Sequence, residues 1–496
     1  MREASTAGDE TAARFDELQR KLVPLWRSIR SMTPDEQTIV VVPSLTVDRE
    51  FHGAEQQAYE ERFLFLLLLL RQPRARLIYV TSLAIAPTIV DYYLGLLPGV
   101  IASHARRRLF LIAPLDASSR PLSKKLLDRP RLLAKIRNLI LDPERAHLVP
   151  FNTTSYERDL ALALGIPMYG CDPKHFPLGT KTGCRRIFAE LNVNHPLGVE
   201  NLRSEEDLAS AIATIRDKKP AIEQVIVKLN EGVSGLGNAI VDLGGTAPLL
   251  EKVRAMKFDD PTQTHDHYIR KLGEVGGVVE ERITGDEFRS PSAQLRITPL
   301  GDVERLSTHD QILGGPSGQL YLGCRFPADP AYAATIMADA TRVGRRLAEE
   351  GVLGRFALDF VAVRSKGGAW ETYAIEINLR KGGTTHPFLT LQFLTDGTYD
   401  PDAGEFRTPT GAPKCFVASD DVASESYRAL THDDLFDIAM RHRFHFDPSR
   451  HTGVVFHMMS ALGDLGRFGL TAVADTPSGA DALYRRTIAA LDADAR

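Results

Sequence analysis

The sequence predicts an α/β protein of several domains. Short β-branched runs alternate with helical patterns over about residues 35–170, which indicates a parallel sheet. After about residue 176 the character changes to paired strands, a glycine-rich loop and a later hairpin. The chain has 496 residues. At roughly 150 residues per domain, this length corresponds to about three domains.

Four short apolar runs are expected to form the parallel sheet, at residues 38–43, 76–81, 108–113 and 146–150. Helical patterns precede and separate them, at residues 11–29, 55–70 and 86–97. Pro24 predicts a bend or break in the first helix, because a proline removes a helical hydrogen bond. No GxGxxG loop follows any of these strands, so the sequence does not support a dinucleotide site.

The second half of the chain begins with a GTKTG turn at residues 179–183, which opens a helix. Ser204 is expected to cap the next helix. Further strands are predicted at residues 225–229, 239–243, 278–283, 294–298, 303–308 and 453–458. A long helix is predicted at 332–350, a hairpin at 356–363 and 370–377, a linker at 401–413 and a closing helix at 479–492.

Composition excludes several classes of protein. Lys and Arg number 60 and Asp and Glu 64, so the net charge of -4 carries no signature of nucleic-acid binding. The longest apolar run, residues 63–70, is far shorter than the roughly 20 residues that span a bilayer. Four cysteines without a CxxC pair argue against a zinc or redox site and fit a reducing cytoplasm. The N-terminal residues lack the apolar region of a secretory signal.

The first segment that suggests chemistry is VIVKLNEGVSGLG at residues 225–237. Its strand carries Lys228, and the following loop contains Gly232, Ser234, Gly235 and Gly237. Glycines let backbone N–H groups approach phosphate oxygens, and a lysine adds a positive charge. An ordinary hairpin with a tight turn is the alternative interpretation.

The second segment is VVEERITGDEF at residues 278–288. Glu280 and Glu281 stand at a strand end, and Glu287 follows a turn at Gly285. These carboxylates could accept hydrogen bonds from an adenine amine and ribose hydroxyls. A solvated acidic turn is the alternative.

The third segment is the most specific. Asp359 belongs to one strand of the predicted hairpin, and Glu376 and Asn378 belong to the other. The latter two are two residues apart, so they face the same side. Two carboxylates and an amide oxygen are ligands that suit Mg²⁺ with nucleotide phosphates. Buried carboxylates paired with Arg355 or Arg380 are the alternative.

In this order and spacing, the three segments resemble the ATP-grasp superfamily over about residues 170–390. The resemblance implies a Rossmann-like α/β domain (1–175), an ATP-grasp module (176–400) whose lid spans about 218–285, and a small C-terminal domain (401–496). It implies that ATP binds with Mg²⁺, for which Mn²⁺ could substitute, and that Asp359, Glu376 and Asn378 hold the metal. The ATP-binding residues that it implies are Lys181, Lys228, Glu231, Gly232, Ser234, Gly235, Gly237, Glu280, Arg282, Ile283 and Glu287.

The chain also resembles the pheganomycin-type peptide ligases of natural product biosynthesis. This resemblance is carried by residues 43–71 and by the strings VIVKLNEGVSGLGN (225–238) and EINLRKGGTTHP (376–387). The resemblance implies a cytoplasmic ligase that joins a small carboxylate to an amine or peptide through an acyl phosphate, and a homodimer. The alternatives are a kinase on the same scaffold and a non-catalytic ATP-binding protein.

The chain departs from a common ATP-grasp pattern at one position. Ala357 stands where many of these ligases have an arginine, two residues before the metal aspartate. Arg296 and Arg380 are therefore the candidates for stabilising the acyl phosphate. His386 is a candidate base for the amine, with a structural role as its alternative.

Overall fold

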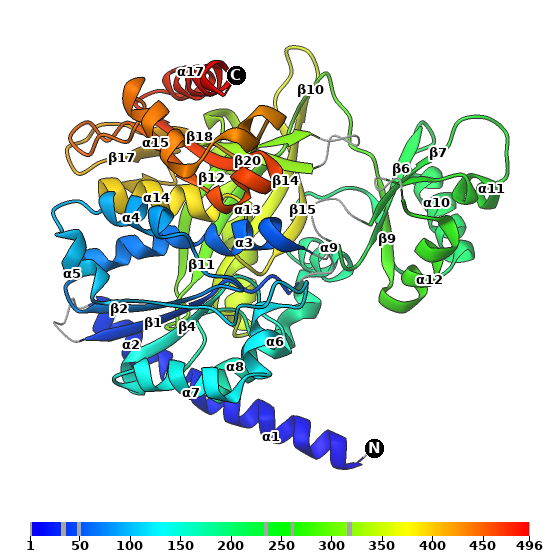
Figure 1. Cartoon of the computed structure of the whole chain (residues 1–496). Coiled ribbons are helices and arrows are strands. Elements are labelled where there is room, and N and C mark those ends of the chain that lie inside the picture. Colours follow the sequence, from blue (N-terminus) through cyan, green and yellow to red (C-terminus); the bar gives the residue numbers. More distant parts are fainter. Residues whose placement is uncertain are drawn as a thin grey trace.

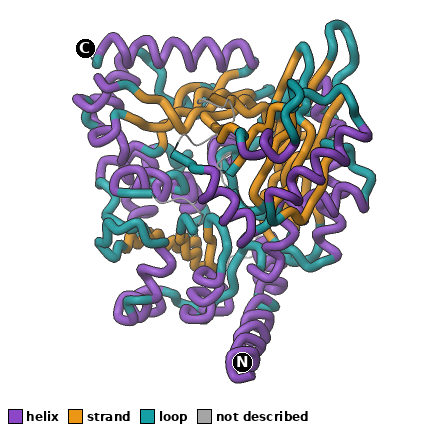
Figure 2. Tube along the Cα trace, turned by 90° about the vertical axis from the view of Figure 1, so that its right-hand side faces the viewer, coloured by secondary structure: helices purple, strands orange, loops and turns teal. Residues whose placement is uncertain are grey.

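The computed structural model describes residues 2–30, 36–46, 51–232, 237–258, 262–314 and 320–495. Figure 1 shows a lower α/β part, a lobe that projects to one side and a large sheet with helices above it. The first helix, α1 (Arg2–Gln19), leaves the bottom of the molecule, and the last, α17 (Pro477–Asp494), crosses its top in both views (Figures 1 and 2). Within the described ranges, no helix combines the length and apolar character needed to cross a bilayer.

The lower part contains the predicted parallel sheet, with strands in the order β3-β2-β1-β4. Their bounds are β1 (Gln37–Val42), β2 (Ala75–Val80), β3 (Leu109–Ile112) and β4 (Ala146–Pro150). Successive residues of β1 alternate between two cores: Ile39 and Val41 face one, and Val40 and Val42 face the other. A strand buried on both faces explains the continuous apolar runs. The Rossmann-like prediction is therefore confirmed.

Two helices differ from the sequence prediction. The segment predicted as a helix bent or broken at Pro24 forms α1 and a separate α2 (Leu22–Arg30), so the helix is broken, but before Pro24. Pro24 lies in the first turn of α2, where its missing N–H costs nothing. The predicted helix at 55–70 divides into α3 (Gly53–Glu61) and a 3₁₀ segment, η1 (Leu64–Arg71). Most of the η1 side chains are buried, because the segment packs against β2, α4 (Pro87–Gly95) and α14 (Thr385–Thr395).

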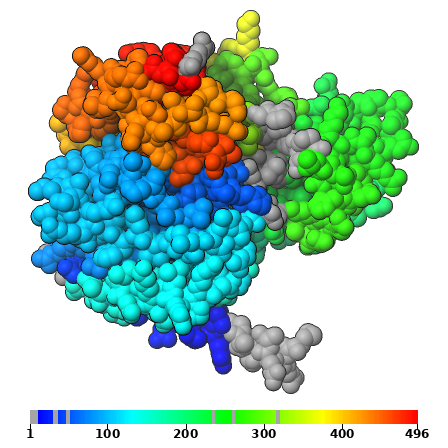
Figure 3. All heavy atoms as spheres, viewed as in Figure 1, coloured from blue at the N-terminus to red at the C-terminus, as the bar shows by residue number. Residues whose placement is uncertain are grey.

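The projecting lobe, residues 198–281, is a five-stranded antiparallel sheet in the order β5-β9-β6-β7-β8 (Figures 1 and 3). Its strands are β5 (Gly198–Leu202), β6 (Gln224–Leu229), β7 (Asn238–Asp242), β8 (Lys257–Phe258) and β9 (Gly277–Glu281). The helices α10 (Glu205–Lys218) and α12 (His265–Val275) share an apolar core with this sheet. Ser204 caps α10 as predicted, by accepting a hydrogen bond from the Asp207 N–H.

The largest sheet has nine strands in the order β10-β14-β11-β12-β13-β18-β20-β19, and β15 also pairs with β14. The strands are β10 (Glu287–Arg289), β11 (Pro291–Ile297), β12 (Val303–Gly314), β13 (Leu320–Phe326), β14 (Gly354–Arg364), β15 (Glu371–Asn378), β18 (Cys415–Ala423), β19 (Gly453–His457) and β20 (Arg467–Ala474). The predicted hairpin is β14–β15. Helix α13 (Pro330–Glu349) packs on this sheet. β13 pairs with β18, so strands from before and after residue 400 belong to one sheet. The domain boundary predicted at residue 400 stays a prediction.

A single apolar core joins the N-terminal helices to the C-terminal strands, with Tyr93, Phe388 and Phe456 among its members. The remaining elements are α5 (Ala102–Arg106), α6 (Leu122–Leu127), α7 (Pro130–Leu139), η2 (Pro143–Arg145), α8 (Ser155–Leu164), η3 (Pro173–Gly179), α9 (Lys181–Glu190), α11 (Leu249–Arg254), β16 (Thr398–Asp400), β17 (Glu405–Arg407), η4 (Glu425–Ala429), α15 (His432–Arg441), η5 (Met459–Ala461) and α16 (Leu462–Leu465). The shared core packs N-terminal helices against C-terminal strands of the large sheet.

Candidate active site

A cavity of about 550 Å³ lies between the lobe and the large sheet. Its walls come from segments that are far apart in the sequence: Arg62 after α3, Lys228 on β6, Asp359 on β14, Glu376 on β15 and Asp420 on β18. Most of the residues that the sequence singled out line this cavity. It is therefore the candidate active site.

The three predicted metal ligands lie together at one end of the cavity. Asp359 and Glu376 are direct cross-strand partners, and Asn378 follows on the same face of β15. The Asn378 side-chain amide donates a hydrogen bond to Asp359 Oδ2 at 2.8 Å, and Gln311 Nε2 donates to Oδ1 at 3.0 Å. Burial, and after it the facing Glu376 carboxylate, raise the pKa of Asp359 to about 6. Two carboxylates are thus held close together despite their repulsion.

Two lysines approach the same end from different elements. Lys181 is the first residue of α9, and its Nζ lies 2.5 Å from Glu376 Oε1. Burial opposes the charge of Lys181, but the Glu376 carboxylate raises the pKa of this lysine above its usual value. Lys228, on β6, is buried and lies 2.6 Å from Glu280 Oε2. Both predicted phosphate-side lysines therefore reach the cavity.

The segment between β9 and β10, which connects the lobe to the large sheet, contributes the next wall. Arg282 and Ile283 line the cavity as expected. The two oxygens of Glu280 accept hydrogen bonds from Lys228 and from Arg185 Nη1, the latter at 2.9 Å. Burial opposes its ionisation, yet these two cations hold the pKa of Glu280 below its usual range. Glu280 is therefore an ionised carboxylate between two positive groups.

The glycine-rich loop is described only at its two ends. Gly232 lines the cavity, and Glu231 is its neighbour in sequence. Gly237 has φ +96°, and its carbonyl accepts hydrogen bonds from the Leu229 N–H and the Tyr268 hydroxyl. Ser234 and Gly235 lie outside the described residues.

Among the described residues, five predicted site residues do not line the cavity: Glu231, Gly237, Glu287, Arg296 and His386. Glu287 instead accepts two hydrogen bonds from Arg364, at 2.7 and 2.9 Å. Arg296 donates to Glu304 at 2.8 Å and stacks on Trp26. His386 is 2% exposed and lies between Asp420 and His457. Of the two candidate arginines, only Arg380 lines the cavity.

Sequence reasoning missed several residues of this site. Arg185 supports Glu280, Gln311 supports Asp359, and Arg62, Phe151 and Asp420 line the end of the cavity beyond Arg380. Arg62 carried a signal, because a charge beside the apolar run 63–70 needs a partner if it is buried. The acidic pair at 420–421 inside a strand was a comparable signal.

Comparisons with known families match the central and C-terminal parts of the chain. Residues 176–260 and 247–402 match the family described as IQCH-like, ATP-grasp. Residues 434–487 match the PGM1 C-terminal domain. The two matches cover the segments that build most of the cavity and part of the C-terminal region.

Two curated relatives are similar over most of the chain. The L-propargylglycine--L-glutamate ligase of Streptantibioticus cattleyicolor is 30% identical over 469 residues, which cover 92% of this chain and 94% of that protein. The IQ motif-containing protein H of Danio rerio is 24% identical over 451 residues, which cover 80% of this chain and 42% of that protein. The first similarity extends over all three parts of the molecule.

Solved structures with the same fold are much more distant in sequence. An ATP-analogue complex of biotin carboxylase from Campylobacter jejuni has a TM-score of 0.56 at 13% identity and covers 92% of this chain and 91% of its own. An ADP complex of N5-carboxyaminoimidazole ribonucleotide synthetase has a TM-score of 0.53 at 12% identity and covers 93% of this chain and 98% of its own. Together with the ligase relative, these likenesses show that the chain belongs to the ATP-grasp superfamily of carboxylate–amine ligases.

Proposed function

We propose that the protein is an ATP-dependent ligase that joins a small carboxylate to an amine or a peptide through an acyl phosphate. The observation that carries the proposal is the composition of one continuous cavity. Metal-type ligands and two lysines line one end of the cavity, and Arg380, Arg62 and Asp420 line its continuation. A nucleotide and a second substrate would therefore meet within the same enclosure.

ATP would bind between the lobe and the large sheet. Lys181 and Lys228 would offset charge on the phosphates, and backbone N–H groups of the loop that includes Gly232 would approach phosphate oxygens. Arg282 and Ile283 would meet the base. Glu280 would hold Lys228 in place and offer its carboxylate to the adenine amine. Glu231, Ser234, Gly235, Gly237 and Glu287 remain family-based proposals for the phosphates and the ribose.

Mg²⁺ fits the residues at the metal end. Asp359, Glu376 and Asn378 supply oxygen donors of the kind that Mg²⁺ prefers. The raised pKa of Asp359 reflects burial and repulsion from Glu376, both of which a cation would relieve. When bound, such a cation would neutralise phosphate charge. Mn²⁺ satisfies the same oxygen ligands.

The chemistry needs positioning rather than an enzyme nucleophile. A substrate carboxylate oxygen attacks the γ-phosphorus of ATP, and ADP leaves. The amine then attacks the acyl carbon, phosphate leaves with the bonding electrons, and the amine nitrogen loses a proton. Arg380 is placed to hold the carboxylate and then the oxyanion, because it follows the metal strand directly. His386 could act on the amine proton only through Asp420, which lines the cavity where His386 does not.

The substrates, cellular location and oligomeric state that we propose are based on the family. The relative's name, L-propargylglycine--L-glutamate ligase, points to amino-acid-sized substrates. We therefore propose small carboxylates and amines or peptides as partners, a cytoplasmic location, a homodimer and a place in natural product biosynthesis. Nucleic acid is not among the partners that we propose, because the chain is close to neutral overall.

The experiment is ADP release from the purified protein against a matrix of carboxylates and amines, with product masses. A ligase releases ADP only when both substrates are present and yields a product equal to their summed mass minus water. A kinase on the same scaffold would release ADP without an amine and yield a phosphorylated product. A non-catalytic ATP-binding protein would bind ATP and release no ADP with any pair.

A further inference from the structure

The end of the cavity beyond Arg380 contains a second buried guanidinium that the mechanism above does not use. Arg62 is 5% exposed and lines the cavity. It comes from the N-terminal part of the chain, directly after α3, whereas Arg380 follows β15. Both guanidinium groups lie against the ring of Phe151, with their centres 5.4 and 6.0 Å from the ring centroid. The cavity therefore offers two neighbouring cations at this end.

The two arginines have different electrostatic neighbours. Arg380 interacts with Glu376 and Asp359 at the metal end. Arg62 interacts instead with Asp420, through a hydrogen bond of 2.8 Å from Nη1 to Oδ2. The order along the cavity is thus metal ligands, Arg380 and then Arg62 with Asp420. Arg380 is the one placed to act on the reacting carboxylate.

The side chain of Arg62 is held in place, but its hydrogen-bonding capacity is not fully used. Its guanidinium lies over the Tyr59 ring at 5.0 Å as well as over Phe151, and stacking of this kind restricts its orientation. A guanidinium has five N–H donors. Its Nε is buried and has no hydrogen-bond acceptor among the described residues. Asp420 engages only Nη1, so the guanidinium retains other donors for a ligand in the cavity that it lines.

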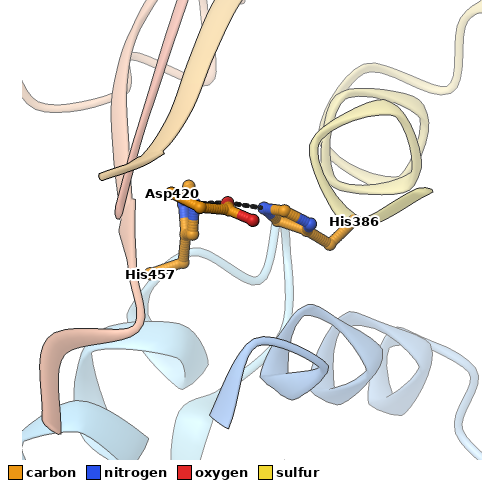
Figure 4. Close-up of side chains that lie close together, drawn as sticks. All are labelled: His386, Asp420 and His457. Carbon is orange, nitrogen blue, oxygen red and sulfur yellow. Dashed lines mark hydrogen bonds and ion pairs between the residues drawn. The ribbon is translucent and has the colours of Figure 1, made fainter. Parts of the chain in front are cut away.

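Asp420 is held by two histidines on its other oxygen (Figure 4). His457 Nε2 lies 3.0 Å and His386 Nε2 3.2 Å from Oδ1, while Oδ2 faces Arg62. All three side chains of this cluster are buried, and their donor atoms lie within 4.8 Å of one another. A divalent cation there would stand beside the Arg62 guanidinium, which makes the cluster a better support for Arg62 than an ion site. His386 and His457 are positioning residues in this arrangement.

We propose that Arg62 binds a carboxylate of the amine-donating substrate that takes no part in the reaction. The inference rests on the ligase function proposed above and narrows it: the enzyme takes amino acids or peptides with a free carboxylate in preference to simple amines. Asp420 accepts a hydrogen bond from Nη1 of Arg62, and the guanidinium has further N–H donors for such a group. Its place beyond Arg380 suits the nucleophile, which must approach the acyl carbon from the side away from ATP. The aromatic and aliphatic walls, among them Phe51 and Tyr321, leave room for a side chain.

The test compares one amine substrate in two forms. The best amino acid or peptide from the ADP-release matrix is assayed as the free acid and as the carboxamide, with ATP and the acyl substrate saturating. The wild type is expected to favour the acid by about tenfold or more in kcat/KM, as expected for a charge-assisted hydrogen bond. R62Q is expected to lose most of this preference through the KM of the acid, whereas R62K retains part of it.

Controls separate recognition from folding. Arg106 forms an exposed ion pair with Asp91 on the outer side of the same α/β part, so R106Q is expected to behave as the wild type. The KM for ATP of R62Q should match the wild type, whereas its melting temperature is expected to fall, because Asp420 is then buried without its guanidinium partner; R62K, which keeps the charge, should lose less. The inference is overturned if R62Q lowers kcat/KM equally for acid and carboxamide, or if the wild type shows no preference. Absence of amide product from the wild type with every amine would overturn the ligase function itself.

Discussion

Asp359 and Glu376 are direct cross-strand partners on β14 and β15, and their carboxylates face the same cavity. Lys181 contacts Glu376, while Asn378 and Gln311 donate hydrogen bonds to Asp359. This arrangement disfavours the charged form of Asp359 in the protein alone, because burial and the neighbouring Glu376 carboxylate both raise the pKa of Asp359. We propose that this group of side chains, which lines the cavity between lobe and sheet, holds a nucleotide-bound cation.

The first prediction concerns this pair. Asp359→Asn keeps the side-chain volume but removes one negative charge. We expect kcat to fall by about 100-fold or more, as is typical when a preorganised charge at a reacting centre is removed. Initial rates of ADP release at several Mg²⁺ concentrations measure the effect. Asp437→Asn, on an exposed helix away from the cavity, is the matched control. Unchanged turnover in Asp359→Asn would refute the metal assignment.

The second prediction concerns Lys228. This lysine is buried beside Glu280, and we propose that it contacts phosphate when ATP binds. Lys228→Ala is expected to raise the KM for ATP by about 10-fold to 100-fold, which corresponds to a lost hydrogen bond to a charged group. Lys135→Ala, on an exposed position of α7, is the control. ATP titration by calorimetry checks the result, and an affinity equal to that of the wild type would exclude the proposed role.

The third prediction concerns Arg380 and Arg296, the two candidates that the sequence offered for stabilising the acyl phosphate. Arg380 lines the cavity, whereas Arg296 is engaged by Glu304 and Trp26 elsewhere. We expect Arg380→Gln to lower kcat by about 100-fold to 1,000-fold while ATP affinity changes little. Arg296→Gln should leave kcat within about threefold of the wild type, as expected of a group outside the site. The opposite ranking in a steady-state assay would assign the oxyanion role to Arg296.

The fourth prediction concerns stability and pH. Glu61 accepts hydrogen bonds from the Met459 and Ser460 N–H groups and so ties α3 to the C-terminal region. Burial raises the pKa of Glu61 from 4.5 to about 7, so the folded protein favours its protonated form. Its stabilising contribution is therefore largest below pH 4.5 and is lost as the pH rises through 7. The slope is limited to about 1.4 kcal/mol per pH unit for one group.

Chemical denaturation of the wild type and Glu61→Gln at pH 5.5 and pH 8 measures this contribution. The free energy of unfolding of the wild type, relative to that of the variant, should decrease between the two pH values. A difference that stays constant, or that increases with pH, would show that Glu61 is not protonated in the folded protein near neutral pH.

The sequence predicted the β14–β15 hairpin because the pattern that indicates it is local. Glu376 and Asn378 are two residues apart on a strand, so their common face follows from strand geometry alone. The same local logic predicted β1 to β4, whose apolar runs identify buried strands. The family resemblance then supplied the relation between segments that periodicity cannot give.

Contacts between distant segments could not be predicted from the sequence. Arg62 and Asp420 are 358 positions apart, and no local pattern specifies that they pair. Glu287 lies where the family places a ribose ligand, but Arg364 on the neighbouring strand engages it in the structure. The strand β18 contains Ser419, Asp420 and Asp421. Because this stretch is polar, the sequence pattern did not predict a strand there. Its position between β13 and β20 depends on tertiary packing.

The most direct test of the central claim follows an oxygen atom. The acyl substrate is labelled with ¹⁸O in its reacting carboxylate, and the inorganic phosphate released during amide formation is analysed by mass spectrometry. Ligation through an acyl phosphate predicts one ¹⁸O in each phosphate and one ADP for each amide. Label found in AMP, or ADP and phosphate formed without label transfer, would contradict the account.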